Sequence, residues 1–126
     1  MFLRAGASLM SDISRLVESA CAYDLSGDVA ASRDAFLSVL LSDPSNVTAL
    51  HHLGIMAFKS GQESDAINYL KSAASAGADR DDVMADMGVI FRYLGDLSQA
   101  EIFLEKACLL APKSASHLYN FGLVLG

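Results

Sequence analysis

The stretch Asp79–Pro112, DRDDVMADMGVIFRYLGDLSQAEIFLEKACLLAP, decides the fold of this chain. Its apolar residues recur three, four and seven positions apart on both sides of Gly95, which is the spacing of one face of an α-helix. Gly95 separates the two runs, at a point where a residue with positive φ can end a helix. Pro112 closes the second run, because proline cannot continue a helix. The stretch therefore predicts two helices joined by a short turn.

The same pattern occurs three times, at a spacing of 34 residues. The turn glycines Gly27, Gly61 and Gly95 keep this spacing, and so do columns of small and of apolar residues. Such a repeat is typical of stacked helical units, because one helix pair cannot bury its apolar face alone. The columns are Ala20, Gly54, Gly88 and Gly122; Leu16, Leu50, Met84 and Leu118; Tyr23, Ala57, Phe91 and Leu125; Phe36, Leu70 and Leu104; and Val39, Ala73 and Ala107.

The repeat register and the local stop signals place the helices. Each of the two prolines is followed by a suitable N-cap, which is Ser45 or Asn46 after Pro44 and Ser114 after Pro112. Short polar side chains of this kind accept from the first free N–H groups of a helix. We expect helices at about 12–25, 28–42, 46–59, 63–76, 80–94, 97–111 and 115–125.

The register also divides the chain into units. We expect repeats at 11–44, 45–78 and 79–112, and the first helix of an incomplete fourth repeat at 113–126. Residues 1–10 precede the first repeat, and we interpret them as an N-terminal tail or an expression remnant. The last unit holds one helix only. This favours a fragment of a longer protein, and the alternative is a last helix that pairs with another subunit.

These columns resemble the tetratricopeptide repeat family. The resemblance covers residues 11–126, and the first repeat departs from the pattern at Ser19 and Ser32, where the family prefers leucine and alanine. It implies an all-α fold of about seven helices, in which antiparallel helix pairs stack into a right-handed superhelical solenoid with a concave groove. The third unit matches most fully, with Met84, Met87-Gly88, Phe91, Gly95-Asp96, Ala100, Leu104, Ala107 and Pro112.

Composition limits the partners. The 126 residues carry a formal charge of −6 and are 52% hydrophobic, which excludes a disordered chain. No lysine or arginine cluster is present, so we expect neither nucleic acid nor an anionic membrane surface as a partner. Apolar stretches fall short of the roughly 20 residues needed for membrane insertion. Two cysteines cannot form a disulfide framework, which favours a reducing compartment and the cytoplasm.

The sequence holds no recognisable catalytic machinery. His51 and His52 are adjacent and point about 100° apart on a helix, which disfavours shared metal ligation. Cys21 and Cys108 lack further ligands at metal-binding spacing. A glycine-rich phosphate loop and a nucleophile elbow are both absent. We therefore predict no catalytic residue, no metal site and no cofactor, and we do not expect this chain to be an enzyme.

The resemblance implies that the first helix of each repeat lines the concave groove. One outward column is apolar in every repeat, namely Cys21, Ile55, Val89 and Leu123. A solvated surface does not require this, so we expect a protein or peptide partner. Part of this column could instead pack between neighbouring helices. The candidate groove residues are Cys21, His51, Ile55, Phe58, Lys59, Val89, Arg92, Tyr93, Tyr119 and Leu123.

Two sub-types of the family can be compared with the groove positions. Chaperone-binding members use a carboxylate clamp of lysine, arginine and asparagine, but these columns hold residues such as Glu18, His51 and Asp86. The asparagine ladder of sugar-transferase-linked repeats is reduced to Asn120. The leading interpretation is a protein-interaction scaffold. The alternatives are a non-catalytic arm of a larger enzyme, such as a glycosyltransferase, and a self-assembling scaffold in which repeats stack between subunits. We also expect the chain to form a homodimer through the exposed last helix.

Overall fold

The computed structural model describes the backbone of residues 2–126 and the side chains of residues 12–126. This part of the chain contains seven helices and no strand, which confirms the all-α prediction. The first helix begins at Phe2, earlier than the expected position 12; the side chains of the predicted tail lie outside the described residues. The helices are α1 (Phe2–Ser26), α2 (Val29–Ser42), α3 (Val47–Lys59), α4 (Glu63–Ala76), α5 (Asp81–Tyr93), α6 (Leu97–Leu110) and α7 (Ala115–Leu125).

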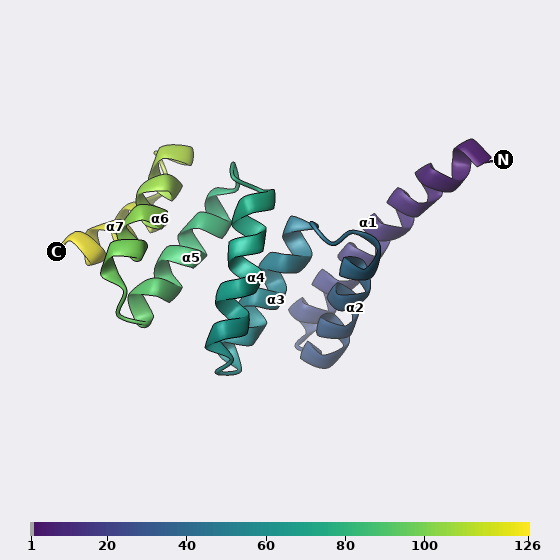
Figure 1. Cartoon of the computed structure of the whole chain (residues 1–126), viewed down its shortest axis with the longest axis horizontal. Helices are drawn as coiled ribbons and strands as arrows, with labels where there is room; N and C mark the ends of the chain where they lie inside the picture. Colours follow the sequence, from purple (N-terminus) through teal and green to yellow (C-terminus); the bar gives the residue numbers. More distant parts are fainter. Residues whose placement is uncertain (1) are drawn as a thin grey trace.

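The helices form a solenoid of antiparallel pairs (Figure 1). α1 packs against α2, α3 against α4, and α5 against α6, and each pair packs on the next. α7 lies at the C-terminal end against α6 and α5. The first helix α5 also contacts the first helices α3 and α7 directly, and no comparable contact joins the described second helices. The first helices therefore lie on the tighter, inner side of the curve, which we call the concave face.

Each helix pair is joined by a turn that needs glycine. Gly27, Gly61 and Gly95 have φ values of 86°, 80° and 84°, a region that other residues rarely adopt. The residue after the first and third of these glycines is an aspartate, and it caps the following helix. Asp28 accepts from the Ala31 N–H at 3.1 Å, and Asp96 accepts from the Gln99 N–H at 3.2 Å. The Gly-Asp pairs thus end one helix and begin the next.

The core is built from columns of the repeat. Three positions of the second helix are fully buried in all three pairs, which fixes the face that each second helix turns inward. In the first pair one of these positions is polar, but the buried Ser32 hydroxyl donates to the Ala20 carbonyl at 2.9 Å. Serine can therefore be buried at position 32, where the family prefers alanine, because its hydroxyl group is hydrogen-bonded. The columns are Ser32, Ala66 and Ala100; Phe36, Leu70 and Leu104; and Val39, Ala73 and Ala107.

Glycines in the first helices allow the two helices of a pair to approach closely. A Cβ atom at Gly54 would lie 2.6 Å from Leu70 Cγ, and one at Gly88 would run into Leu104 Cγ in the same way. The equivalent Gly122 on α7 has open space at this position. Packing therefore excludes a side chain at Gly54 and Gly88 in the second and third repeats. Gly122 on α7 has no facing leucine of this kind among the described residues.

This difference gives a matched pair of substitutions. Gly88→Ala should lower the free energy of unfolding by about 2 kcal/mol, because overpacking a well-filled contact outweighs the helix propensity of alanine. Gly122→Ala should raise it by about 0.5–1 kcal/mol, because the same methyl group enters open space and the backbone loses less entropy. Urea denaturation followed by circular dichroism measures both. Equal changes in the free energy of unfolding of the two variants would contradict the close approach at Gly88.

Candidate functional site

The concave face holds a cleft of about 430 Å³. Residues of α3 supply most of its floor, α1 and α5 supply the two walls, and α2 contributes one residue from its first turn. The lining is mixed, with apolar, imidazole and carboxylate side chains close together, so it is suited to a ligand that has both apolar and polar groups. The lining residues are Asp24, Val29, His51, His52, Ile55, Met56, Lys59, Ser60 and Asp86.

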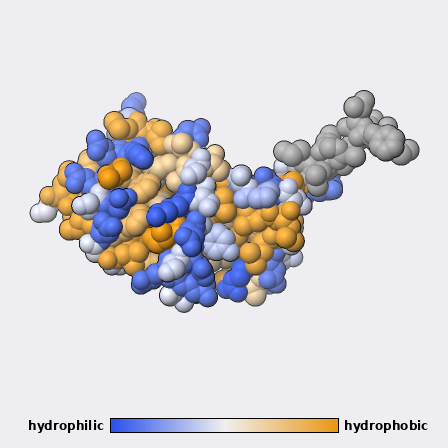
Figure 2. Space-filling view, in the orientation of Figure 1, coloured by the Kyte–Doolittle hydropathy of each residue, from blue (hydrophilic) through white to orange (hydrophobic). Residues whose placement is uncertain are grey.

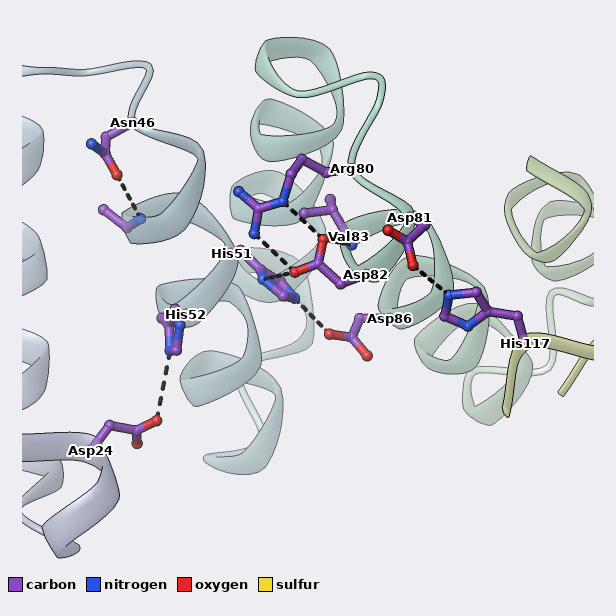
Figure 3. Close-up of polar contacts among 11 residues, drawn as sticks. Asp24, Asn46, His51, His52, Arg80, Asp81, Asp82, Val83, Asp86 and His117 are labelled. Carbon is purple, nitrogen blue, oxygen red and sulfur yellow. Dashed lines mark hydrogen bonds and ion pairs between the residues drawn. The ribbon is translucent and has the colours of Figure 1, made fainter. Parts of the chain in front are cut away.

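The polar part of the cleft is organised by contacts between histidine and aspartate (Figure 3). His51 Nε2 lies 2.5 Å from Asp86 Oδ2, and His51 Nδ1 lies 3.8 Å from Asp82 Oδ2. His52 Nδ1 lies 3.6 Å from Asp24 Oδ2. The two adjacent histidines therefore reach in opposite directions along the solenoid, one toward α5 and the other toward α1.

A third pair repeats this arrangement at the next interface. His117 Nε2 on α7 lies 2.7 Å from Asp81 Oδ2 on α5. The chain has three histidines, so every one of them links a first helix to the first helix of a neighbouring repeat. The three histidines therefore place polar contacts between neighbouring first helices along the concave face.

A further ion pair stands beside the cleft at the start of α5. Arg80 Nε donates to Asp82 Oδ1 at 2.9 Å, and Arg80 Nη2 donates to Asp82 Oδ2 at 2.8 Å. The hydrogen bonds from Arg80 lower the pKa of the Asp82 carboxyl, although its partial burial acts in the opposite direction. Two-point pairing of this kind fixes the guanidinium plane as well as its charge. Arg80 and Asp82 therefore largely neutralise each other.

An aromatic cluster lies at the C-terminal ends of α3 and α5. The rings of Phe58 and Tyr93 have centroids 6.0 Å apart and are tilted relative to each other. The Arg92 guanidinium carbon lies 5.3 Å from the Tyr93 ring centroid, within cation–π range. Tyr93 remains 70% exposed, so most of its surface is open to solvent.

The predicted groove residues fall into three groups. His51, Ile55 and Lys59 line the cleft, and Phe58, Arg92 and Tyr93 form the neighbouring aromatic cluster. The other predicted residues lie on first helices outside the cleft lining: Cys21 and Val89 are half-buried, and Tyr119 and Leu123 are exposed on α7.

Several lining residues were absent from the predicted set. His52 and Asp86 belong to one polar column of the first helices, and Asp24 belongs to a mixed column with Phe58 and Arg92. Only the packing shows that these three side chains converge on the cleft. Met56 is a buried core residue, and it also contacts the cleft. Val29 comes from the first turn of α2, and the repeat pattern carries no signal for it.

The cysteines give no sign of reactive chemistry. Both are free, and burial raises the pKa of the Cys21 and Cys108 thiols; Asp24 adds to the effect at Cys21. A raised pKa keeps the thiol protonated, and the thiolate is the nucleophile. Among the residues whose side chains are described, no group of three or more His, Cys, Asp or Glu is placed to hold a metal ion. Within the same part of the chain, every helix is too short or too polar to cross a membrane.

α7 exposes apolar side chains at the end of the solenoid. Leu118 is 52% exposed, whereas the equivalent Leu50 and Met84 are almost completely buried. Leu125 is 59% exposed, whereas the equivalent Ala57 and Phe91 are buried. On the face drawn in Figure 2, hydrophobic residues reach the surface at the C-terminal end of the solenoid, where α6 and α7 lie. The homodimer expected through the last helix stays a prediction.

Comparison with protein families agrees with this architecture. Residues 82–114 match the family model described as the tetratricopeptide repeat. This segment overlaps the stretch from which the repeat was first identified, and solved tetratricopeptide-repeat structures match most of the chain. The resemblance to the tetratricopeptide repeat family is therefore confirmed. A comparison with curated proteins found no match.

Solved structures extend the likeness across most of the chain. A mutant O-GlcNAc transferase of Thermobaculum terrenum is 26% identical with a TM-score of 0.85 over 93% of this chain, which spans 22% of that protein. The first tetratricopeptide domain of Spaghetti (RPAP3), bound to an HSP90 peptide, is 16% identical with a TM-score of 0.81, covering 90% of each chain. MamA is 25% identical with a TM-score of 0.77, over 89% of this chain and 61% of MamA.

The environment of His52 predicts a pH dependence of stability. Burial lowers the pKa of His52, His51 and Arg80 lower it further, and Asp24 opposes them. Because the folded state holds the proton less tightly than the unfolded state, stability should be highest above the ordinary histidine pKa of about 6.5 and fall as the pH drops below it. In thermal melts at a series of pH values, the His52→Gln variant should lose less stability than the wild type as the pH falls below about 6.5. A His52 pKa above the ordinary value, measured by NMR titration, would contradict the assignment.

Proposed function

We propose that this chain is a protein-interaction scaffold whose concave face binds an extended peptide or a helix of a protein partner. The observation that carries the proposal is the apolar column along the first helices. Cys21, Ile55 and Val89 are half-buried, and Leu123 is 44% exposed. A surface facing only water does not need an apolar residue in each repeat.

The packing explains part of this column and leaves the rest for a partner. Ile55 packs partly on the core around Leu70 and Met87, which is the contribution to neighbouring helices anticipated from the sequence. The same side chain also lines the cleft, so it has a second surface open to a ligand. Concave, mostly preformed sites with an apolar floor and a few fixed polar groups are the usual form of binding sites.

The fold is compatible with this use. Two similar solved structures are RPAP3 domains in complex with peptides, one from HSP90 and one from HSP70. Their identities to this chain are 16% and 14%, so they support the fold and leave the choice of ligand to the residues of this groove.

A second candidate function is a non-catalytic arm of a larger enzyme. It is favoured by the 26% identity to the O-GlcNAc transferase, of which this chain matches 22%. The reading frame of the gene beyond the codon for Gly126 tests it. A frame that continues into a catalytic domain supports the arm, and a stop codon at that point contradicts it.

Val89→Glu tests the proposed groove. Val89 lies at the centre of the apolar column, and a carboxylate there would have to be desolvated beneath a bound ligand. We expect the variant to lose at least about tenfold in affinity for peptides that the wild-type chain selects from a random display library, since a buried unpaired charge costs several kcal/mol. Fluorescence polarisation with labelled peptides measures the loss.

Two controls separate binding from folding. Leu41→Glu introduces the same charge on α2 at a position that is 87% exposed, and it should bind as the wild type does. Tyr119→Ala removes a side chain that is 68% exposed on α7, so it should weaken binding of long peptides without unfolding the chain. Unchanged affinity in both Val89→Glu and Tyr119→Ala would show that the groove assignment is wrong.

A further inference from the structure

We propose that the cleft between α1, α3 and α5 selects a peptide segment in which a lysine or arginine lies next to a large apolar residue. This inference rests on the proposed function, because it names the kind of peptide that the concave face would take. It follows from the charge, the hydrogen-bonding capacity and the apolar floor of this one cleft.

The two walls of the cleft each present a carboxylate. Asp24 comes from α1 and Asp86 from α5, and each uses its Oδ2 atom to contact a histidine of the floor. The side chains remain 41% and 42% exposed, respectively, and no hydrogen bond from within the described chain occupies either Oδ1 atom. A carboxylate only accepts hydrogen bonds, so the exposed Oδ1 atom on each wall can accept from a cationic or N–H donor of a ligand in place of water.

The floor between these walls is apolar on one side and imidazole on the other. Ile55 and Met56 from α3 and Val29 from α2 provide the apolar part, and the histidines are already engaged by the walls. A long aliphatic side chain that ends in a cation satisfies both parts, because its methylene groups lie on apolar surface while the charged end reaches a carboxylate. Lysine and arginine have this form.

The charges around the cleft favour the same choice. With neutral histidines, the lining carries two aspartates against Lys59, and Arg80 is occupied by its two-point contact with Asp82. Lys59 is exposed and lies in the last turn of α3, where a cation is also favoured by the helix dipole. The whole chain has a formal charge of −6, which adds to the attraction of basic segments.

The same features disfavour acidic peptides. The peptides bound in the two RPAP3 structures end in Glu-Glu-Val-Asp. A ligand of that kind would place its carboxylates beside Asp24 and Asp86, and like charges brought together at a binding surface reduce affinity. This chain thus shares the fold of those domains, but its cleft would favour a basic peptide in place of an acidic one.

The test is selection of random linear peptides displayed on phage against the full chain. We expect the selected peptides to be enriched in lysine or arginine beside leucine, isoleucine, phenylalanine or methionine. Synthetic copies should bind the Asp24→Asn and Asp86→Asn variants about threefold more weakly each, a loss typical of partly exposed charge pairs. The double variant should also lose most of the salt dependence of binding.

Asp34→Asn is the matched control, because it removes the same charge from an exposed position on α2 and should leave affinity unchanged. Selection of acidic peptides, or basic peptides that bind the double variant as tightly as the wild type, would overturn the charge preference. In that case sensitivity to Val89→Glu would still support the groove. Failure to select any peptide above background would count against the proposed function itself.

Discussion

The close approach of two helix backbones at a glycine is the contact on which the rest of this structure depends. At Gly54 and Gly88 the facing leucines, Leu70 and Leu104, occupy the space that a side chain would need. The small residue of this column, glycine in the second and third pairs and Ala20 in the first, goes with complete burial of the same three positions of the second helix in every pair. Each pair then presents a fixed edge on which the next pair can stack, and the concave face follows from that stacking.

Much of this fold could be predicted from the sequence, because its determinants are local and repeat at a constant interval. Gly27, Gly61 and Gly95 have the positive φ that their place between two apolar runs suggested, and Asn46 and Ser114 cap their helices as expected. The early start of α1 at Phe2 was missed. Residues before position 12 have no counterpart elsewhere in the chain, so the repeat pattern gave no information about them.

The candidate site was harder to predict, because its polar contacts cross between repeats. His51 meets Asp86 and His117 meets Asp81 at separations of 35 and 36 residues, about one repeat length. Looking within one helix for an acid near His51 could not find these partners. A search for opposite charges offset by one repeat and one or two residues would have found both pairs. The convergence of Val29 and Met56 on the cleft depends on the turn after α1 and on side-chain packing, which column patterns do not specify.

In the part of the chain that the structure describes, extensive packing joins only helices that are adjacent or next but one in sequence. Because the register is 34 residues, duplicating or losing one such unit by recombination would leave each remaining helix with neighbours of the kind it has now. The length of the concave face is therefore an evolvable quantity that is separate from its local chemistry. Changing the number of units would change the length of the concave face, while the residues that line a single cleft would stay the same.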